Sequence, residues 1–185
     1  MFHAYVENPE NLRFEGQSPD EKILLLLRAH PITNIPWIFF SLVFFLVPFF
    51  VPRLAAFFGF SLNLIPDTYL LAFLIINYLI SLAIAFEGFL YWYFNVTLIT
   101  AQKIIDIDFE PVLYKGVDLA PLPKIEETDS KTAGIFGTFF NFGNVSVQTA
   151  GATVAIEMKN VPKPAIVADL ILDWAGVAHQ HMRGI

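Results

Sequence analysis

Three acidic residues offer the first possible chemistry in this sequence, because Asp106, Asp108 and Glu110 occupy alternate positions. Alternate positions share one face of a β-strand, and paired carboxylates can exchange protons with a substrate or hold a hard cation. More often such a row is the solvent-facing side of a sheet, and we favour that interpretation. A second acidic cluster, at residues 126–129, is interpreted in the same way.

Residue types that support catalysis or metal binding do not gather into a recognisable site. The sequence has no cysteine, which excludes disulfides, thiol catalysis and cysteine-ligated metals. His179 and His181 are two positions apart, so on a helix they point away from each other and not toward one metal ion. The motifs of serine hydrolases, zinc proteases and kinases are missing. We therefore predict a non-enzymatic protein with no catalytic residues, no metal and no cofactor.

A segment rich in glycine and phenylalanine, GIFGTFFNFG at residues 134–143, is the best local candidate for a binding surface. It lacks the lysine and the serine or threonine of a phosphate-binding loop. Two interpretations of its aromatic side chains stay open. They can belong to the core, or part of the segment can expose them to the bilayer or to a protein partner. The side chains concerned are those of Phe136, Phe139, Phe140 and Phe142.

The composition indicates a membrane protein. Of the 185 residues, 56% are hydrophobic and 15% are charged, whereas soluble domains have about 45–50% apolar and about 25% charged residues. Two stretches, at about residues 32–52 and 68–92, are long and apolar enough to span a bilayer as helices. The composition excludes a disordered chain, and the formal charge of −6 argues against a nucleic-acid partner. The lipid bilayer is the first partner that the sequence predicts.

Three polar residues in the second apolar stretch are candidate polar contacts within the membrane. Asn77 and Ser81 are four positions apart, so they can bond to the first helix or, alternatively, to carbonyls of their own helix. A charge such as that of Glu87 is costly at the centre of a bilayer. Here Glu87 precedes Tyr91, Trp92 and a further tyrosine, a cluster typical of the membrane interface. We therefore expect Glu87 at the interface.

The basic residues predict the orientation in the membrane. Among the 11 Lys and Arg residues, only Arg53 lies in the connection between the two stretches, and the others lie in the two tails. Because Lys and Arg are enriched in cytoplasmic segments, we expect both termini in the cytoplasm of a multi-pass protein of the bacterial inner (plasma) membrane. Residues 1–22 contain five acids and no apolar core, so we expect no cleavable signal peptide.

Outside the apolar stretches, the hydrophobic pattern predicts a small β domain with one closing helix. Alternating apolar residues predict strands, strongly at residues 94–99, 104–109, 145–149 and 154–158 and more weakly at 112–114, 117–119 and 125–128. Helical periodicity then predicts an amphipathic helix at about residues 163–181 that packs over the open end of the sheet. The expected buried stripe comprises Ile166, Val167, Leu170, Ile171, Trp174 and Val177.

The apolar residues 21–28 lie directly before the first stretch, and as a strand they would join the same sheet. The membrane hairpin would then be an insertion in the β domain. We expect an N-terminal cytoplasmic segment at residues 1–30, a two-helix hairpin at 31–93 and the β domain at 94–185.

Phe89–Asp108 (FLYWYFNVTLITAQKIIDID) resembles the end of the second span and the first hairpin of bacterial pleckstrin-homology (PH) domain proteins, in the membrane-flanked YdbS-like group. The resemblance continues over Leu119–Gly151, with a proline-containing strand, a glycine–aromatic loop and a strand that ends in VQTAG. It covers about residues 20–175. The turn Ala101-Gln102-Lys103 departs from the family's more polar turn, which puts any contact made by that turn in doubt.

The resemblance implies a PH-like fold, with two nearly orthogonal antiparallel sheets capped by a C-terminal helix. It implies a non-enzymatic membrane protein, of a group partly linked to envelope stress or resistance to membrane-active peptides. Specific phosphoinositide binding is disfavoured, because the corresponding hairpin offers only Lys103 beside Asp106 and Asp108. We predict a membrane-tethered scaffold that binds a protein partner or forms a homo-oligomer. The alternative is a subunit of a transporter or of an export or envelope-protection complex.

Overall fold

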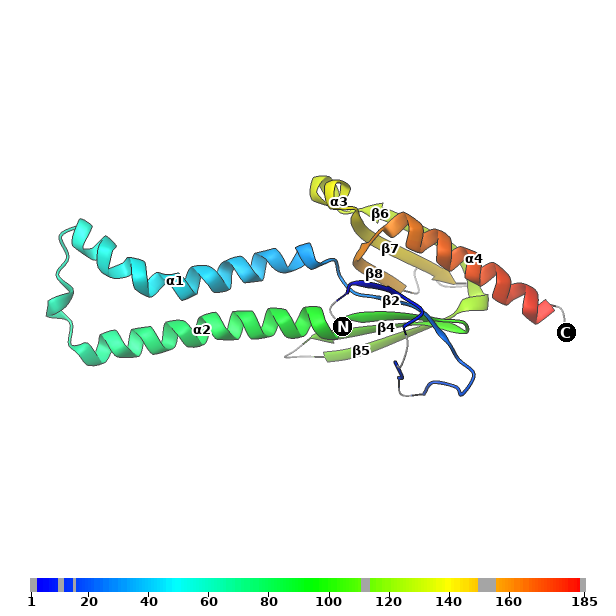
Figure 1. Cartoon of the computed structure of the whole chain (residues 1–185), viewed down its shortest axis with the longest axis horizontal. Helices are drawn as coiled ribbons and strands as arrows, with labels where there is room; N and C mark the ends of the chain where they lie inside the picture. Colours follow the sequence, from blue (N-terminus) through cyan, green and yellow to red (C-terminus); the bar gives the residue numbers. More distant parts are fainter. Residues whose placement is uncertain (1–2, 10–11, 15, 111–113, 150–155, 184–185) are drawn as a thin grey trace. The chain divides into compact units, whose positions relative to one another are not determined.

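The computed structural model describes residues 3–9, 12–14, 16–110, 114–149 and 156–183. The chain forms two compact units, of which one contains Met1–Thr33 and Trp92–Ile185 and the other contains Asn34–Tyr91. The first unit holds the strands and is called the β unit, and the second is called the helical unit (Figure 1). Because the chain returns to the β unit after residue 91, the helical unit is an insertion in it.

The helical unit is built from two long apolar helices, α1 (Ile35–Phe57) and α2 (Asp67–Phe94), with a short 3₁₀ turn, η2 (Leu62–Leu64), between them. Both helices are long and apolar enough to cross a membrane. Pro36 is placed in the first turn of α1, where its missing N–H costs nothing. Pro48 and Pro52 lie inside the helix, which continues through both to Phe57 and does not end at residue 52 as the sequence suggested.

The first sheet of the β unit has five antiparallel strands in the order β1-β2-β3-β4-β5. Their bounds are Tyr5–Glu7, Ile23–Leu27, Val96–Thr100, Lys103–Glu110 and Tyr114–Pro121. β2 pairs with β3, as expected for a strand at residues 21–28, and Leu27 is the register partner of Thr97. The chain therefore leaves the sheet for the helical unit, and returns from it, on two neighbouring strands. η1 (Pro31–Asn34) connects β2 to α1.

The second sheet has three antiparallel strands, β6 (Ile125–Thr132), β7 (Phe142–Thr149) and β8 (Ile156–Pro162), in that order. A 3₁₀ turn, η3 (Leu122–Lys124), joins the two sheets, and a short helix, α3 (Gly134–Phe140), joins β6 to β7. The C-terminal helix α4 (Pro164–Arg183) runs along the second sheet (Figure 1). The predicted combination of two long apolar helices and an antiparallel β unit is confirmed.

Several strands differ from their predicted lengths. The weak patterns at residues 117–119 and 125–128 belong to the eight-residue strands β5 and β6. β1, with only three residues and no alternation, was not predicted. Of the residues in predicted strands, 112–113 and 154–155 lie outside the described residues.

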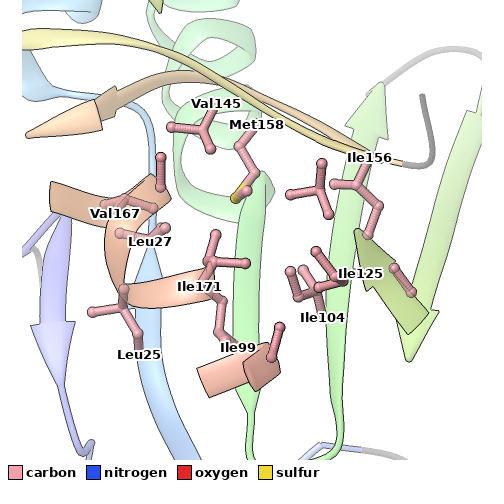
Figure 2. Packing of buried hydrophobic residues seen from close by; sticks show 14 of the residues in the cluster. Leu25, Leu27, Ile99, Ile104, Ile125, Val145, Ile156, Met158, Val167 and Ile171 are labelled. Atoms are coloured by element: carbon pink, nitrogen blue, oxygen red, sulfur yellow. The ribbon is translucent and has the colours of Figure 1, made fainter. Parts of the chain in front are cut away.

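The main core lies between the two sheets and α4 (Figure 2). Leu25 and Leu27 of β2, Ile99 of β3 and Ile104 of β4 contribute side chains from the first sheet, and α4 contributes Val167 and Ile171. Full burial of each such side chain stabilises the fold by about 1.5–3 kcal/mol. The predicted stripe of α4 is wrong for Ile166 and Val177, which are exposed. The buried face is completed instead by Ala168 and Ala175, whose small size lets α4 approach the sheet closely.

Candidate functional site

The glycine–phenylalanine segment forms α3, which presents four large apolar side chains to solvent. Their exposed fractions are 88% for Ile135, 72% for Phe136, 81% for Phe139 and 41% for Phe140. We call these four residues the α3 surface. The core interpretation is therefore wrong for Phe136, Phe139 and Phe140, and the exposed interpretation describes them.

Phe142, the fourth candidate phenylalanine, does not belong to this surface, because its side chain is only 7% exposed, and the core interpretation describes it. It is the first residue of β7, and its ring stacks on His30 with the ring centroids 5.4 Å apart. The backbone N–H of His30 donates to the carbonyl of Asn160 at 2.7 Å. The segment that leads into α1 is thus fastened to the end of the second sheet at which α3 joins β7.

Gly137 explains why the phenylalanines of α3 point outward. A Cβ on Gly137 would lie 2.6 Å from the carbonyl oxygen of Phe142, so only glycine lets the helix lie this close to β7. Asn141 ends the helix in the left-handed region with φ of 54°, and its N–H donates to the carbonyl of Gly137. The face of α3 that contains Gly137 packs against β7, so the large side chains lie on the opposite face of the helix.

A second apolar cluster covers the other face of the first sheet. It contains Ile23, Leu26, Leu98 and Ile105, against which Leu12 and Phe14 of the N-terminal segment pack. Sequence reasoning missed this cluster, because residues 12–14 show no periodic pattern that would place them on a sheet.

A groove of about 450 Å³ opens beside this cluster. Arg13 and Arg28 line it together with apolar side chains that include Tyr93 and Phe94. The guanidinium carbon of Arg28 lies 4.8 Å from the centroid of the Tyr93 ring, in a cation–π arrangement. Burial lowers the pKa of Arg28 from its ordinary value.

A buried carboxylate, Glu21, anchors the segment before β2. It accepts hydrogen bonds from the Thr100 hydroxyl at 2.6 Å and from the Ser18 N–H at 3.1 Å, and the Lys103 ammonium lies 3.4 Å away. Burial acts to raise the pKa of Glu21, but the two hydrogen bonds and the Lys103 charge outweigh it and hold the pKa below its ordinary value. The same ion pair occupies Lys103, the single basic residue that the hairpin offered to an anionic headgroup.

The acidic stripe of β4 is not a solvated face throughout, because Asp106 is only 8% exposed. Its Oδ1 accepts a hydrogen bond from the Thr97 hydroxyl at 2.5 Å. Burial raises the pKa of Asp106 to about 6 against the lowering effect of Thr97, and Asp108 and Asp118 add to the rise. Asp108 is exposed as expected, and nothing is described of the Glu110 side chain. Asp106 shares a strand face with the core residue Ile104, which accounts for its burial.

The described residues contain no group of three or more histidine and acidic side chains that could hold a metal ion. The His179 ring lies on α4 with Nδ1 3.3 Å from the carbonyl oxygen of Pro123. Nothing is described of the His181 side chain.

In the helical unit, the predicted polar contact between the helices exists at Ser81. The hydroxyl of Ser81 donates to the carbonyl of Ser41 at 2.8 Å, and the hydroxyl of Ser41 donates to the carbonyl of Ser81 at 3.0 Å. Asn77 is also buried, but its Oδ1 has no hydrogen-bond partner among the described residues. Glu87 is exposed on α2.

Comparisons with known proteins find no matching family model, no similar curated protein and no similar solved structure.

Proposed function

We propose that this protein is an integral membrane protein whose helical hairpin spans the bacterial plasma membrane and whose PH-like β unit is a binding module on the cytoplasmic side. The module serves as a scaffold that binds a protein partner. The exposure of the helical unit carries this proposal. Each candidate span has a most apolar window of 18 residues. In the span that contains α1, none of this window is buried, and in α2 only 11% of it is buried.

Such exposure argues for lipid and against water. Soluble monomers rarely expose contiguous apolar patches of more than a few hundred Å², whereas both helices expose large side chains all around, among them Phe39, Phe49, Leu71 and Leu82. The 23 residues of α1 extend about 35 Å at about 1.5 Å per residue, which matches a hydrocarbon core of about 30 Å. The Ser41–Ser81 contact is also the kind of interhelical bond that small polar residues make in membranes.

The α3 surface is the proposed docking site of the partner. Four large exposed apolar side chains on seven residues of helix are an aromatic-rich patch of the kind that marks protein contacts. The chain leaves this end of the β unit for α1 through His30, so the partner is expected to be another membrane protein with an apolar segment near the cytoplasmic interface.

Photocrosslinking in native membranes tests the binding module. A photoreactive phenylalanine analogue in place of Phe139 should give a discrete crosslinked protein band, whereas the same analogue in place of the exposed Tyr69 on α2 should not give that band. A Phe136→Ser, Phe139→Ser double variant should lose the partner while the chain remains in the membrane. If residue 139 crosslinks only lipid, the scaffold function is wrong.

A second function, as a subunit of a transporter or envelope-protection complex, is favoured by the buried Oδ1 of Asn77, for which the described part of the chain provides no hydrogen-bond donor. Ser81 is already engaged with Ser41. Of the other two candidate polar residues, Glu87 is exposed and Asn77 is buried with an unsatisfied oxygen. An Asn77→Leu, Glu87→Gln variant with altered assembly or altered sensitivity to membrane-active peptides would support this function. Unchanged behaviour would leave the scaffold as the better account.

A further inference from the structure

The outer face of the first sheet carries an apolar groove that the proposed scaffold function does not use. Val96, Leu98, Ile107 and Phe109 form its floor, and Leu12 and Phe14 form one side. Its volume of about 450 Å³ falls within the range of roughly 300–1,000 Å³ that is typical of small-molecule sites.

The charges of the described residues at the groove have one sign. Among the described residues that line it, the only charged ones are Arg13 and Arg28, and no acidic side chain is present. An apolar floor beside two guanidinium groups matches a ligand with an apolar chain and an acidic head. Guanidinium groups bind phosphate oxygens through paired, charge-assisted hydrogen bonds, which makes a phosphate the best-matched head.

The groove also lies where the chain comes back from the helical unit. Tyr93 and Phe94, which line it, are the last two residues of α2. The helical unit ends at residue 91, so in a protein whose helices span the membrane these two lining residues follow the membrane segment within three positions of the chain. Arg28 follows β2 directly, so the strands on both sides of the insertion contribute to the same groove.

We propose that this groove binds an anionic phospholipid of the surrounding bilayer, with one acyl chain over Leu98 and Ile107 and the phosphate at Arg13 and Arg28. The proposal rests on the membrane location proposed above. It adds a specific lipid contact to the β unit, separate from the α3 surface.

The test uses the full chain in nanodiscs that contain phosphatidylcholine and a small fraction of phosphatidylglycerol with a photoactivatable acyl chain. Irradiation should label peptides of β3 and β4. An Ile107→Trp variant, which fills the groove, should lose this label. The matched Leu119→Trp variant should keep it, because Leu119 lies on the same sheet face but does not line the groove.

Charge variants test the contact between the lipid phosphate and the two arginines. Arg13→Gln and Arg28→Gln should each lower labelling by phosphatidylglycerol roughly tenfold, as expected for one lost charge-assisted contact. Lys124→Gln, which removes an exposed charge elsewhere, should leave labelling unchanged. Amide hydrogen exchange of each variant verifies that β3 and β4 remain folded.

Labelling confined to α1 and α2, equal labelling by a phosphatidylcholine probe, or labelling by a free fatty acid but not by phosphatidylglycerol would each overturn the proposal. These outcomes leave the membrane location intact. A chain that fails to enter nanodiscs at all would instead contradict the proposed function.

Discussion

Two buried carboxylates in the β unit have opposite surroundings. Glu21 is surrounded by the Thr100 hydroxyl, the Ser18 N–H and the Lys103 ammonium, so its charged form is stabilised. Asp106 has one hydroxyl donor and lies near two further acids, so its charged form is disfavoured. Their contributions to folding stability therefore depend on pH in opposite directions.

Asp106→Asn should increase the stability of the β unit at neutral pH. The pKa of Asp106 is raised from 3.8 to about 6 in the folded state, so the wild type loses stability as the pH rises through about 6. The variant keeps an acceptor for Thr97 without this loss, and at pH 7.5 it should gain about 1–3 kcal/mol. Hydrogen exchange of β3 and β4 in detergent measures the difference. A variant that is less stable than wild type at every pH would contradict this assignment.

Glu21→Gln should destabilise the β unit by about 1–3 kcal/mol at neutral pH, because it removes a buried charge that three groups satisfy. The depressed pKa of Glu21 means that the wild type retains this stability above the ordinary value of 4.5 and loses it as the pH falls further. The variant should lack that acidic decline. Glu126→Gln, at an exposed position of β6, is the control and should behave as wild type.

At the scale of elements, the strands and helices that have a clear hydrophobic period could be predicted from the sequence, and those without one could not. The period of two in residues 104–109 and 145–149 marks strands, and the uninterrupted apolar stretches mark α1 and α2, because these signals extend over whole elements. α3 has only seven residues and two glycines, so its phenylalanines fit a core loop as well as an exposed helix. Their exposure depends on the approach of Gly137 to Phe142, which the sequence does not reveal.

The same limit applies to the groove. Its floor comes from β3 and β4, where the alternation shows which residues share a face, but one side comes from residues 12–14, far away in the sequence. Asp106 was assigned to the solvent although it shares a face with Ile104, because Ile104 and Ile105 are both apolar and the pattern does not identify the inner face.

Gly88→Ala should destabilise the helical unit. A Cβ at this position would lie 2.4 Å from Cγ of the Trp37 ring. Either the Trp37 side chain must shift or α1 and α2 must separate. Overpacking of this kind costs about 1–3 kcal/mol. Gly176→Ala in α4 is the matched control, since nothing lies within 4 Å of its added Cβ, and it should stabilise by about 0.5–1 kcal/mol. Thermal unfolding in detergent compares the two, and equal effects would refute the close contact at Gly88.

Ile171→Ala in α4 should cost about 2–5 kcal/mol, because this side chain is fully buried between the two sheets. Leu172→Ala, at the next position but exposed, should cost less than about 0.5 kcal/mol. Hydrogen exchange of β3 and β7 measures both. Similar losses of stability in the two variants would mean that the face of α4 that contains Ile171 does not pack into the core.

At the scale of the whole molecule, the β unit has its own buried core, whereas the helical unit has polar side-chain contacts between its helices but leaves most of its large apolar side chains uncovered. In water such a surface would drive aggregation, and in a bilayer it is matched by lipid. The division of the chain into two units with such different surfaces underlies both the anchoring and the binding proposals.

The central claim, that the hairpin spans the plasma membrane with the β unit inside the cell, is tested most directly by cysteine accessibility. The sequence has no cysteine, so single substitutions report without background. With a membrane-impermeant maleimide, Asn63→Cys between the helices should be labelled in intact cells (as spheroplasts where an outer membrane is present), and Gln180→Cys on α4 only after permeabilisation. Labelling of Gln180→Cys in intact cells, or release of the chain from membranes by alkaline carbonate, would contradict the account.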